Sequence, residues 1–192
     1  MLEKFVSTIL SIISNPYKYF LQDMPKGDSL KESLIFTITV SSVSFAVQSV
    51  SFLSILRSDG LLSILGYLIL FCIFMPVLKL FFLCVFAFFA HMAIFFFVPQ
   101  RTGFKQTFKV LAYSSAANVF LVVPVVGIAA SVIFEIRAFV FGLSAVHNVS
   151  CLKMLMLFVI VLIIISMFLV ILSLFLFGAA ILSYIPEFLP PI

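Results

Sequence analysis

The chain has 192 residues, of which 65% are hydrophobic and 9% are charged, against roughly 45–50% and 25% in an ordinary soluble domain. A soluble fold of this length has no interior large enough to hide so much apolar surface, so lipid must cover it. The net charge of +4 comes from dispersed basic residues near the ends of apolar runs, which indicates membrane orientation and argues against nucleic acid as a partner.

The first 30 residues are expected to form a cytoplasmic amphipathic segment ahead of the membrane domain. Apolar residues recur at helical spacing in its first half: Leu2, Phe5, Val6, Ile9, Leu10 and Ile13. This spacing predicts a helix of about 14 residues, which Asn15-Pro16 ends. The helix either lies in the headgroup plane or packs on the membrane-spanning helices.

A first membrane span is predicted from Ser33 to Leu56, a run of 24 residues without a charge. Polar residues form a straight seam along this helix, at spacings of four, three, four and three: Thr37, Ser41, Ser44, Gln48 and Ser51. Small and hydroxyl residues let membrane helices approach closely and hydrogen-bond across the contact. The seam is therefore either a helix–helix interface or the lining of a polar pathway.

The apolar run from Leu61 to Pro99 has 39 residues, too many for one upright span and barely enough for two. One broken span here gives five in total. The basic residues outside the spans then share one side, except for Arg57; they are Lys4, Lys18, Lys26, Lys31, Arg101, Lys105, Lys109 and Lys153. Two spans would instead divide the basic residues evenly. The positive-inside rule favours five spans with a cytoplasmic N-terminus, and Pro76 then kinks the second span.

Between Lys109 and Lys153 lie 43 residues with only two formal charges. A single helix of that length would be roughly 65 Å long, about twice the hydrocarbon core. The segment must therefore cross twice, with the turn at Val123-Pro124-Val125, where proline breaks the helix. The second crossing carries a seam of mostly small residues at spacings of four, four, three and four: Gly127, Ser131, Glu135, Ala138 and Gly142.

The last span fills the uncharged run from Met154 to Ile185, and residues 186–192 form a short outer tail. The predicted fold is therefore all-α. It is a polytopic integral membrane protein with five transmembrane helices over residues 31–185 and an amphipathic helix before them. The C-terminus is expected on the outer or lumenal side of the membrane, opposite the N-terminus.

Four ionisable side chains fall inside the predicted spans and form a candidate intramembrane polar site: Lys79, His91, Glu135 and Arg137. Each intramembrane charge costs roughly 2.5–3.5 kcal/mol on insertion scales, so partners are expected. Glu135 and Arg137 are two residues apart and point to different faces. Glu135 should therefore bind Lys79 or Arg137 of a second copy, while Arg137 could instead reach the headgroups. The charges are either structural or serve proton or ion coupling, and His91 is expected to be a hydrogen-bonded packing residue.

Signatures of catalysis, cofactor binding and metal binding do not occur in the sequence. It contains no GxSxG, HExxH, P-loop or GxGxxG motif. The three cysteines, Cys72, Cys84 and Cys151, form no CxxC pair, so neither a disulfide framework nor a zinc site is indicated. No catalytic residue, cofactor or metal is predicted, and an enzyme is not expected.

Residues in the second half of the chain share an order and spacing with a known family: Tyr113-Ser114, Pro124 followed by Gly127, Gly142-Leu143, His147, and Ser150 with Lys153. The segments NPYKYF and KESLIF before the first span add to the likeness. On these residues the chain resembles the Yip domain family, the Ypt/Rab-interacting multispanning membrane proteins, over residues 15–175.

The resemblance implies five spans, a cytosolic N-terminus and an outer or lumenal C-terminus. Eukaryotic members are linked to Rab GTPases and vesicle traffic, which implies a Rab-type GTPase as partner. The short segment before the first span is similar to the compact prokaryotic branch, which implies the bacterial cytoplasmic membrane.

Two functions are consistent with these features. The first is a non-enzymatic scaffold or interaction protein of membrane organisation or trafficking, which associates with itself or with other membrane proteins. The alternative is a small transporter or channel that uses Lys79, Glu135 and Arg137. A water-accessible cavity at Glu135 would favour transport, whereas a dry, packed centre would favour scaffolding.

Overall fold

The described part of the chain is helical throughout. The computed structural model describes residues 2–25, 30–55, 66, 69–99, 101–123 and 126–184, and these contain no strand. In chain order the elements are α1 (Leu2–Ser14), α2 (Pro16–Lys18), the π-helical turn η1 (Tyr19–Asp23), α3 (Lys31–Ile55), the π-helical turn η2 (Leu70–Phe74), α5 (Met75–Phe97), α6 (Phe104–Ser114), the 3₁₀-helix η3 (Ser115–Val122), α7 (Val126–His147) and α8 (Cys151–Tyr184). The predicted all-α fold is confirmed.

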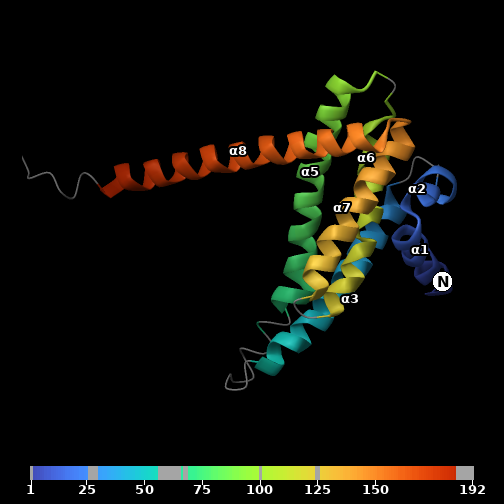
Figure 1. Ribbon diagram of the computed structural model, residues 1–192. Helices are drawn as coiled ribbons and strands as arrows, with labels where there is room; N and C mark the ends of the chain where they lie inside the picture. Colours follow the sequence, from blue (N-terminus) through green and yellow to red (C-terminus); the bar gives the residue numbers. More distant parts are fainter. Residues whose placement is uncertain are drawn as a thin grey trace, which may run out of the picture.

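A bundle of α3, α5, α6–η3 and α7 forms the body of the molecule (Figure 1). The continuous path of α6 and η3 lies at its centre, where every residue from Thr107 to Asn118 is buried. This central helix carries several small buried side chains, among them Ala112, Ala116 and Ala117. Because small residues let backbones approach closely, the three neighbouring helices can all pack on this one element.

Three of the described helices are long and apolar enough to cross a membrane: Cys72–Phe97, Val126–His147 and Cys151–Phe175. These helices are compatible with an integral membrane protein. The third, within α8, has the highest mean hydropathy of the three, 3.5, yet only 11% of it is buried, against 28% and 39% for the other two. Figure 1 shows α8 crossing α5 and then extending far beyond the bundle.

Two irregular stretches of helix lie where the sequence disfavours regular hydrogen bonding. The π-helical turn η2 ends at Phe74, two residues before Pro76, whose ring nitrogen has no proton to donate to the preceding turn. The 3₁₀-helix η3 begins where Ser114 and Ser115 donate back to the carbonyls of Val110 and Ala112, at 2.8 and 2.6 Å. Such side-chain bonds compete with the helical ladder.

The predicted turn after the third span falls in a gap between two elements. η3 ends at Val122 and α7 begins at Val126, so the helical path is broken where the sequence predicts a break. Pro124 itself lies outside the described residues. So do residues 61–65 at the start of the predicted second span, and the tail from 186 to 192.

The N-terminal segment packs on the flank of the bundle. Ile12 of α1 and Phe20 of η1 are only 1% and 3% exposed, and both belong to the same apolar core as the long helices. Burial, and secondarily the neighbouring Tyr113, raises the pKa of the Tyr19 phenol above its ordinary value. Of the two predicted placements for α1, the structure has the one in which it packs on the spans, although Val6 and Leu10 remain exposed.

Arg137 of α7 holds the end of α1 in place. Its Nη1 and Nη2 donate to the carbonyl oxygens of Ile13 and Ser14 at 3.1 and 3.2 Å. The last carbonyls of a helix lack partners within the helix and carry partial negative charge, so a guanidinium satisfies both needs. The sequence predicts that Arg137 reaches the headgroups or Glu135 of a second copy. In the structure Arg137 instead contacts α1 of the same chain.

Replacing Arg137 with methionine is therefore expected to loosen α1 without unfolding the bundle. Hydrogen exchange followed by mass spectrometry should show faster exchange across residues 2–14, because the variant leaves both carbonyls without their donor. Arg101→Met is the matched control, since Arg101 lies over the Phe95 ring at 3.9 Å and has no described contact with α1. Equal exchange in both variants would contradict the assigned role.

Candidate functional site

An ion pair between two of the predicted intramembrane charges lies at the centre of the site. Lys79 Nζ on α5 is 3.2 Å from Glu135 Oε1 and 3.5 Å from Oε2 on α7. The two side chains are 21% and 34% exposed. Of the two partners that the sequence predicts for Glu135, the structure has Lys79, and the pair joins two helices that are far apart along the chain.

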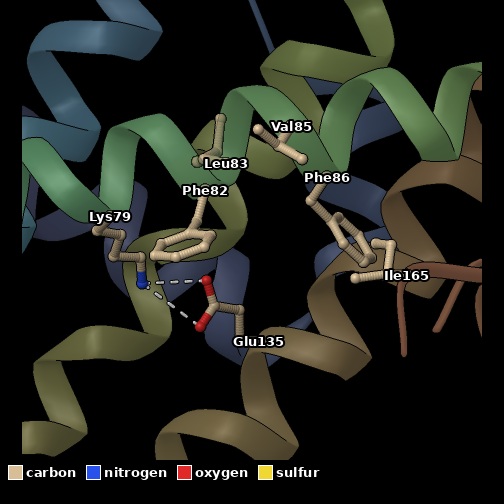
Figure 2. Close-up of a pocket in the computed structure, with 7 residues that line it drawn as sticks. All are labelled: Lys79, Phe82, Leu83, Val85, Phe86, Glu135 and Ile165. Carbon is tan, nitrogen blue, oxygen red and sulfur yellow. Dashed lines mark hydrogen bonds and ion pairs between the residues drawn. The ribbon is translucent and has the colours of Figure 1, made fainter. Parts of the chain in front are cut away.

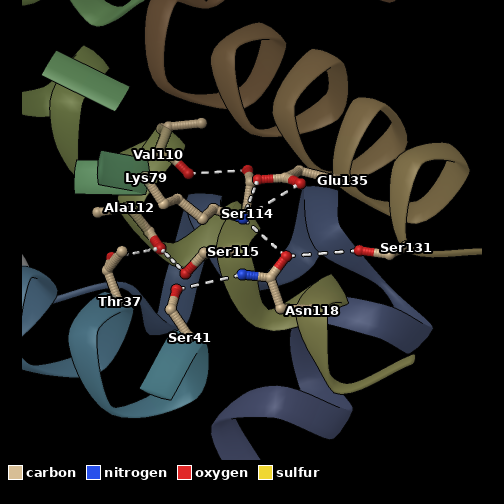
Figure 3. Close-up of polar contacts among 10 residues, drawn as sticks. All are labelled: Thr37, Ser41, Lys79, Val110, Ala112, Ser114, Ser115, Asn118, Ser131 and Glu135. Atoms are coloured by element: carbon tan, nitrogen blue, oxygen red, sulfur yellow. Dashed lines mark hydrogen bonds and ion pairs between the residues drawn. The ribbon is translucent and has the colours of Figure 1, made fainter. Parts of the chain in front are cut away.

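Asn118 of η3 connects this ion pair to the first predicted seam. Its Oδ1 accepts from Lys79 Nζ at 2.7 Å and from Ser131 Oγ at 3.4 Å, while its Nδ2 donates to Ser41 Oγ at 3.3 Å (Figure 3). Asn118 is only 1% exposed. One amide therefore binds α3, α5 and α7 at once. Its oxygen accepts two hydrogen bonds, one of them from the Lys79 ammonium, and its nitrogen donates one.

Beside the ion pair lies an open hollow of about 310 Å³. Its walls come from α5, α7 and α8, and its lining residues are Lys79, Phe82, Leu83, Val85, Phe86, Glu135 and Ile165. Figure 2 shows Lys79 and Glu135 at one end, with Phe86 and Ile165 at the other. The hollow reaches both charges, but every other wall residue is apolar.

Both predicted seams face the interior over most of their length. In the first seam Thr37, Ser41 and Ser44 are 2% exposed or less, Gln48 is half-buried, and the side chain of Ser51 lies outside the described residues. In the second seam all four small residues are buried: Gly127, Ser131, Ala138 and Gly142. Thr37 Oγ1 also donates to the Ala112 carbonyl at 2.8 Å, as expected for a helix–helix interface.

His91 does not join the ion pair but belongs to a second polar network. Its Nδ1 lies 3.0 Å from Thr107 Oγ1, which lies 3.2 Å from His147 Nε2. The backbone N–H of Thr102 donates to His147 Nδ1 at 3.2 Å. In the neutral ring the proton is then on Nε2, so His147 donates to Thr107, and Thr107 donates to His91. The expected packing role of His91 is consistent with this hydrogen bond.

Thr107→Val is expected to destabilise the junction of α5, α6 and α7, because it leaves the buried Nε2–H of His147 without an acceptor. The loss should be about 1–3 kcal/mol, measured as denaturant unfolding in detergent. Thr102→Val is the matched control: it also removes a hydroxyl bonded to His147, at 3.1 Å, but keeps the backbone donor. A smaller loss is expected there, and the reverse order would contradict the assigned hydrogen-bond directions.

The sequence interpretation missed Asn118, Thr107 and His147 as members of polar networks. Asn118 was recognisable in principle, because an amide in an otherwise uncharged span needs partners. Thr107 had no such signal, because it lies between Lys105 and Lys109, in a segment that the sequence predicts to be a loop. The buried cation Lys109 was assigned to a loop end, yet it is 1% exposed and donates to the Pro25 carbonyl at 3.1 Å.

Within the described ranges, no group of three or more His, Cys, Asp or Glu side chains is placed to hold a metal ion. Comparison of the chain with known protein families, with curated proteins and with solved structures found no match. The site consists of one ion pair, one bridging amide and a mostly apolar hollow.

Proposed function

We propose that the chain is a non-enzymatic membrane protein of Yip type with five spans, which serves as a scaffold or interaction protein. Its partners are the lipid bilayer and either other membrane proteins or a second copy of itself. The Yip assignment rests on the resemblance described above. A Rab-type GTPase as a partner is proposed from that resemblance alone. The observation that carries the proposal is the exposed stretch of α8 from Met167 to Phe175.

Five spans are supported by the lengths and positions of two helices besides the three apolar ones. α3 has 25 residues. The path of α6 and η3 from Phe104 to Val122 is about 30 Å long, and its part beyond Lys109 is roughly 24 Å long, most of the hydrocarbon thickness. The bond between Thr102 and His147 joins the start of α6 to the end of α7. Both helix ends are thus on one side, in agreement with a cytoplasmic face for Arg101 and Lys153.

The topology predicts the accessibility of the loop before α8. In a variant without Cys72, Cys84 and Cys151, a cysteine introduced by Ser150→Cys should resist a membrane-impermeant thiol reagent in sealed right-side-out vesicles. It should react once the vesicles are permeabilised, because Ser150 is exposed. Labelling of the sealed vesicles would favour six spans over five.

A scaffold is supported over a transporter by how the polar groups are satisfied. Ser41, Ser131 and Asn118 bind one another or Lys79. Among the described residues, Gln106 Oε1 is the buried side-chain atom without a hydrogen-bond partner. Buried polar groups that are already paired hold helices together and leave little capacity for a passing ion.

The transporter alternative is favoured by one observation, the hollow that reaches Lys79 and Glu135. Its apolar walls give an ion no further polar contact once it leaves the pair. The exposed stretch of α8 supports the scaffold instead. Its exposed residues surround the helix; they include Met167, Phe168, Ile171, Leu174, Phe175 and Phe177. A helix that is apolar all round needs lipid or other helices on every side.

Photo-crosslinking from α8 in native membranes tests the proposal. A photoreactive amino acid is placed in turn at positions 167–175, and protein adducts are separated from lipid adducts. A docked partner helix should give protein adducts from one stripe with a spacing of three or four residues, and lipid adducts elsewhere. Lipid adducts from every position would reject α8 as an interaction element.

A further inference from the structure

The hollow beside the ion pair has the size and the wall chemistry of a small binding site. Its volume of about 310 Å³ is at the lower end of the range of roughly 300–1,000 Å³ for small-molecule sites. Five of its seven lining residues are apolar: Phe82, Leu83, Val85, Phe86 and Ile165. Such walls bind hydrocarbon, and the two charged residues confine polar contacts to one end (Figure 2).

Hydrogen-bonding capacity at the polar end favours a donor as ligand. The ionised carboxylate of Glu135 has about four acceptor positions, and the donor that the described residues supply to it is Lys79 Nζ. The carboxylate side chain is 34% exposed. Lys79 has less to offer, since its ammonium also donates to Asn118 at 2.7 Å.

The charges at the polar end select a neutral group. A carboxylate or phosphate at this end would be attracted by Lys79 but repelled by Glu135, and an amine would meet the reverse. Because the two charges of the ion pair oppose each other, a charged group gains little net attraction to offset the loss of its hydration in a site walled by phenylalanine. A hydroxyl group loses less hydration, and it can donate its proton to the carboxylate in a charge-assisted hydrogen bond.

We propose that the hollow binds a neutral lipid with a free hydroxyl group, of the monoacylglycerol or long-chain alcohol class. The hydroxyl donates to Glu135, and the chain lies along Phe82 and Phe86 of α5 and Ile165 of α8. The site then bridges α5, α7 and α8 at the point where α8 leaves the bundle. It is independent of the proposed function, because a scaffold with no partner on α8 could still bind the lipid.

The test uses the full-length protein in nanodiscs and a photoreactive monooleoylglycerol as probe. Adducts should map to the segments around Phe82–Phe86 and Ile165. Unlabelled monooleoylglycerol should compete at concentrations roughly tenfold below those of oleate and oleylamine, which have similar chains but charged ends. Equal competition by all three would mean that the hollow accepts any hydrocarbon, and it would overturn the proposal.

Two variants that fill the hollow without touching the ion pair complete the test. Val85→Trp and Ile165→Trp are on different helices, α5 and α8, so a folding defect in one variant is not expected to recur in the other. Each should reduce adduct yield several-fold at unchanged helix content. Phe88→Trp is the control, because Phe88 is 55% exposed and does not line the hollow. Undiminished labelling in both filled variants would reject the site.

Discussion

Lys79→Met is expected to destabilise the protein more than Glu135→Gln, although both break the same ion pair. Methionine leaves the Glu135 carboxylate with apolar neighbours, and it also removes the donor to Asn118 Oδ1. Glutamine keeps an acceptor for Lys79, whose ammonium retains Asn118 as well. Removing one partner of a buried ion pair costs roughly 3–5 kcal/mol. Since the two side chains are 21% and 34% exposed, we expect about 3 kcal/mol for Lys79→Met and less for Glu135→Gln.

The double variant Lys79→Met/Glu135→Gln separates an unpaired charge from lost packing. It should be more stable than Lys79→Met alone, because no uncompensated carboxylate remains. Unfolding is followed in detergent, with Lys153→Met as control at an exposed lysine. A double variant less stable than either single variant would contradict the paired-charge account.

The same variants decide between the two functions. In proteoliposomes, wild type and Glu135→Gln should show no more proton flux than vesicles without protein. The reason is that Glu135 is held in an ion pair with Lys79 within the protein. Flux in the wild type that Glu135→Gln abolishes would support the transporter instead. Because stability and flux are measured on one preparation, a misfolded variant cannot be mistaken for an inactive transporter.

The ion pair could be predicted from sequence because charges inside apolar spans need partners, and few candidates exist. Glu135 lies on a seam of small residues, so its inward direction followed from the helical period. The partner of Arg137 could not be predicted in this way. Its acceptors are backbone carbonyls of α1, and every residue has such a carbonyl, so no side-chain pattern marks them.

The helical fold and the break near Pro124 were likewise predictable from hydropathy and proline. The placement of α6–η3 at the centre was not, because several helices contain small residues and the sequence does not rank them. Asn118 acquires its role only when α3, α5 and α7 surround it at once. The course of α8 beyond the bundle also had no signal, since an apolar run predicts a helix but not its neighbours.

Gly127 of the second seam is the position where one added methyl group should have the largest steric effect. A Cβ there would overlap the carbonyl oxygen of Phe120 and lie 2.9 Å from its carbonyl carbon. Both are backbone atoms of η3, so no side-chain rotation can relieve the clash. Overpacking typically costs about 1–3 kcal/mol, and we expect Gly127→Ala to exceed that range, because η3 and α7 must separate. The separation should also disturb the contact between Ser131 and Asn118, 3.4 Å apart.

Gly142 provides the matched comparison within the same helix. A Cβ there would lie 2.6 Å from Phe20 Cδ2 and 2.6 Å from Val110 Cγ1, and both are side-chain atoms that can move. Gly142→Ala should therefore cost less than Gly127→Ala, and Phe20→Leu should restore part of its stability. No side-chain substitution should rescue Gly127→Ala in the same way. Denaturant unfolding in detergent compares Gly127→Ala, Gly142→Ala and the double variant Gly142→Ala/Phe20→Leu with wild type. If Gly127→Ala proved as stable as wild type, the close contact between η3 and α7 could not exist, and Asn118 would lose the position from which it binds three helices.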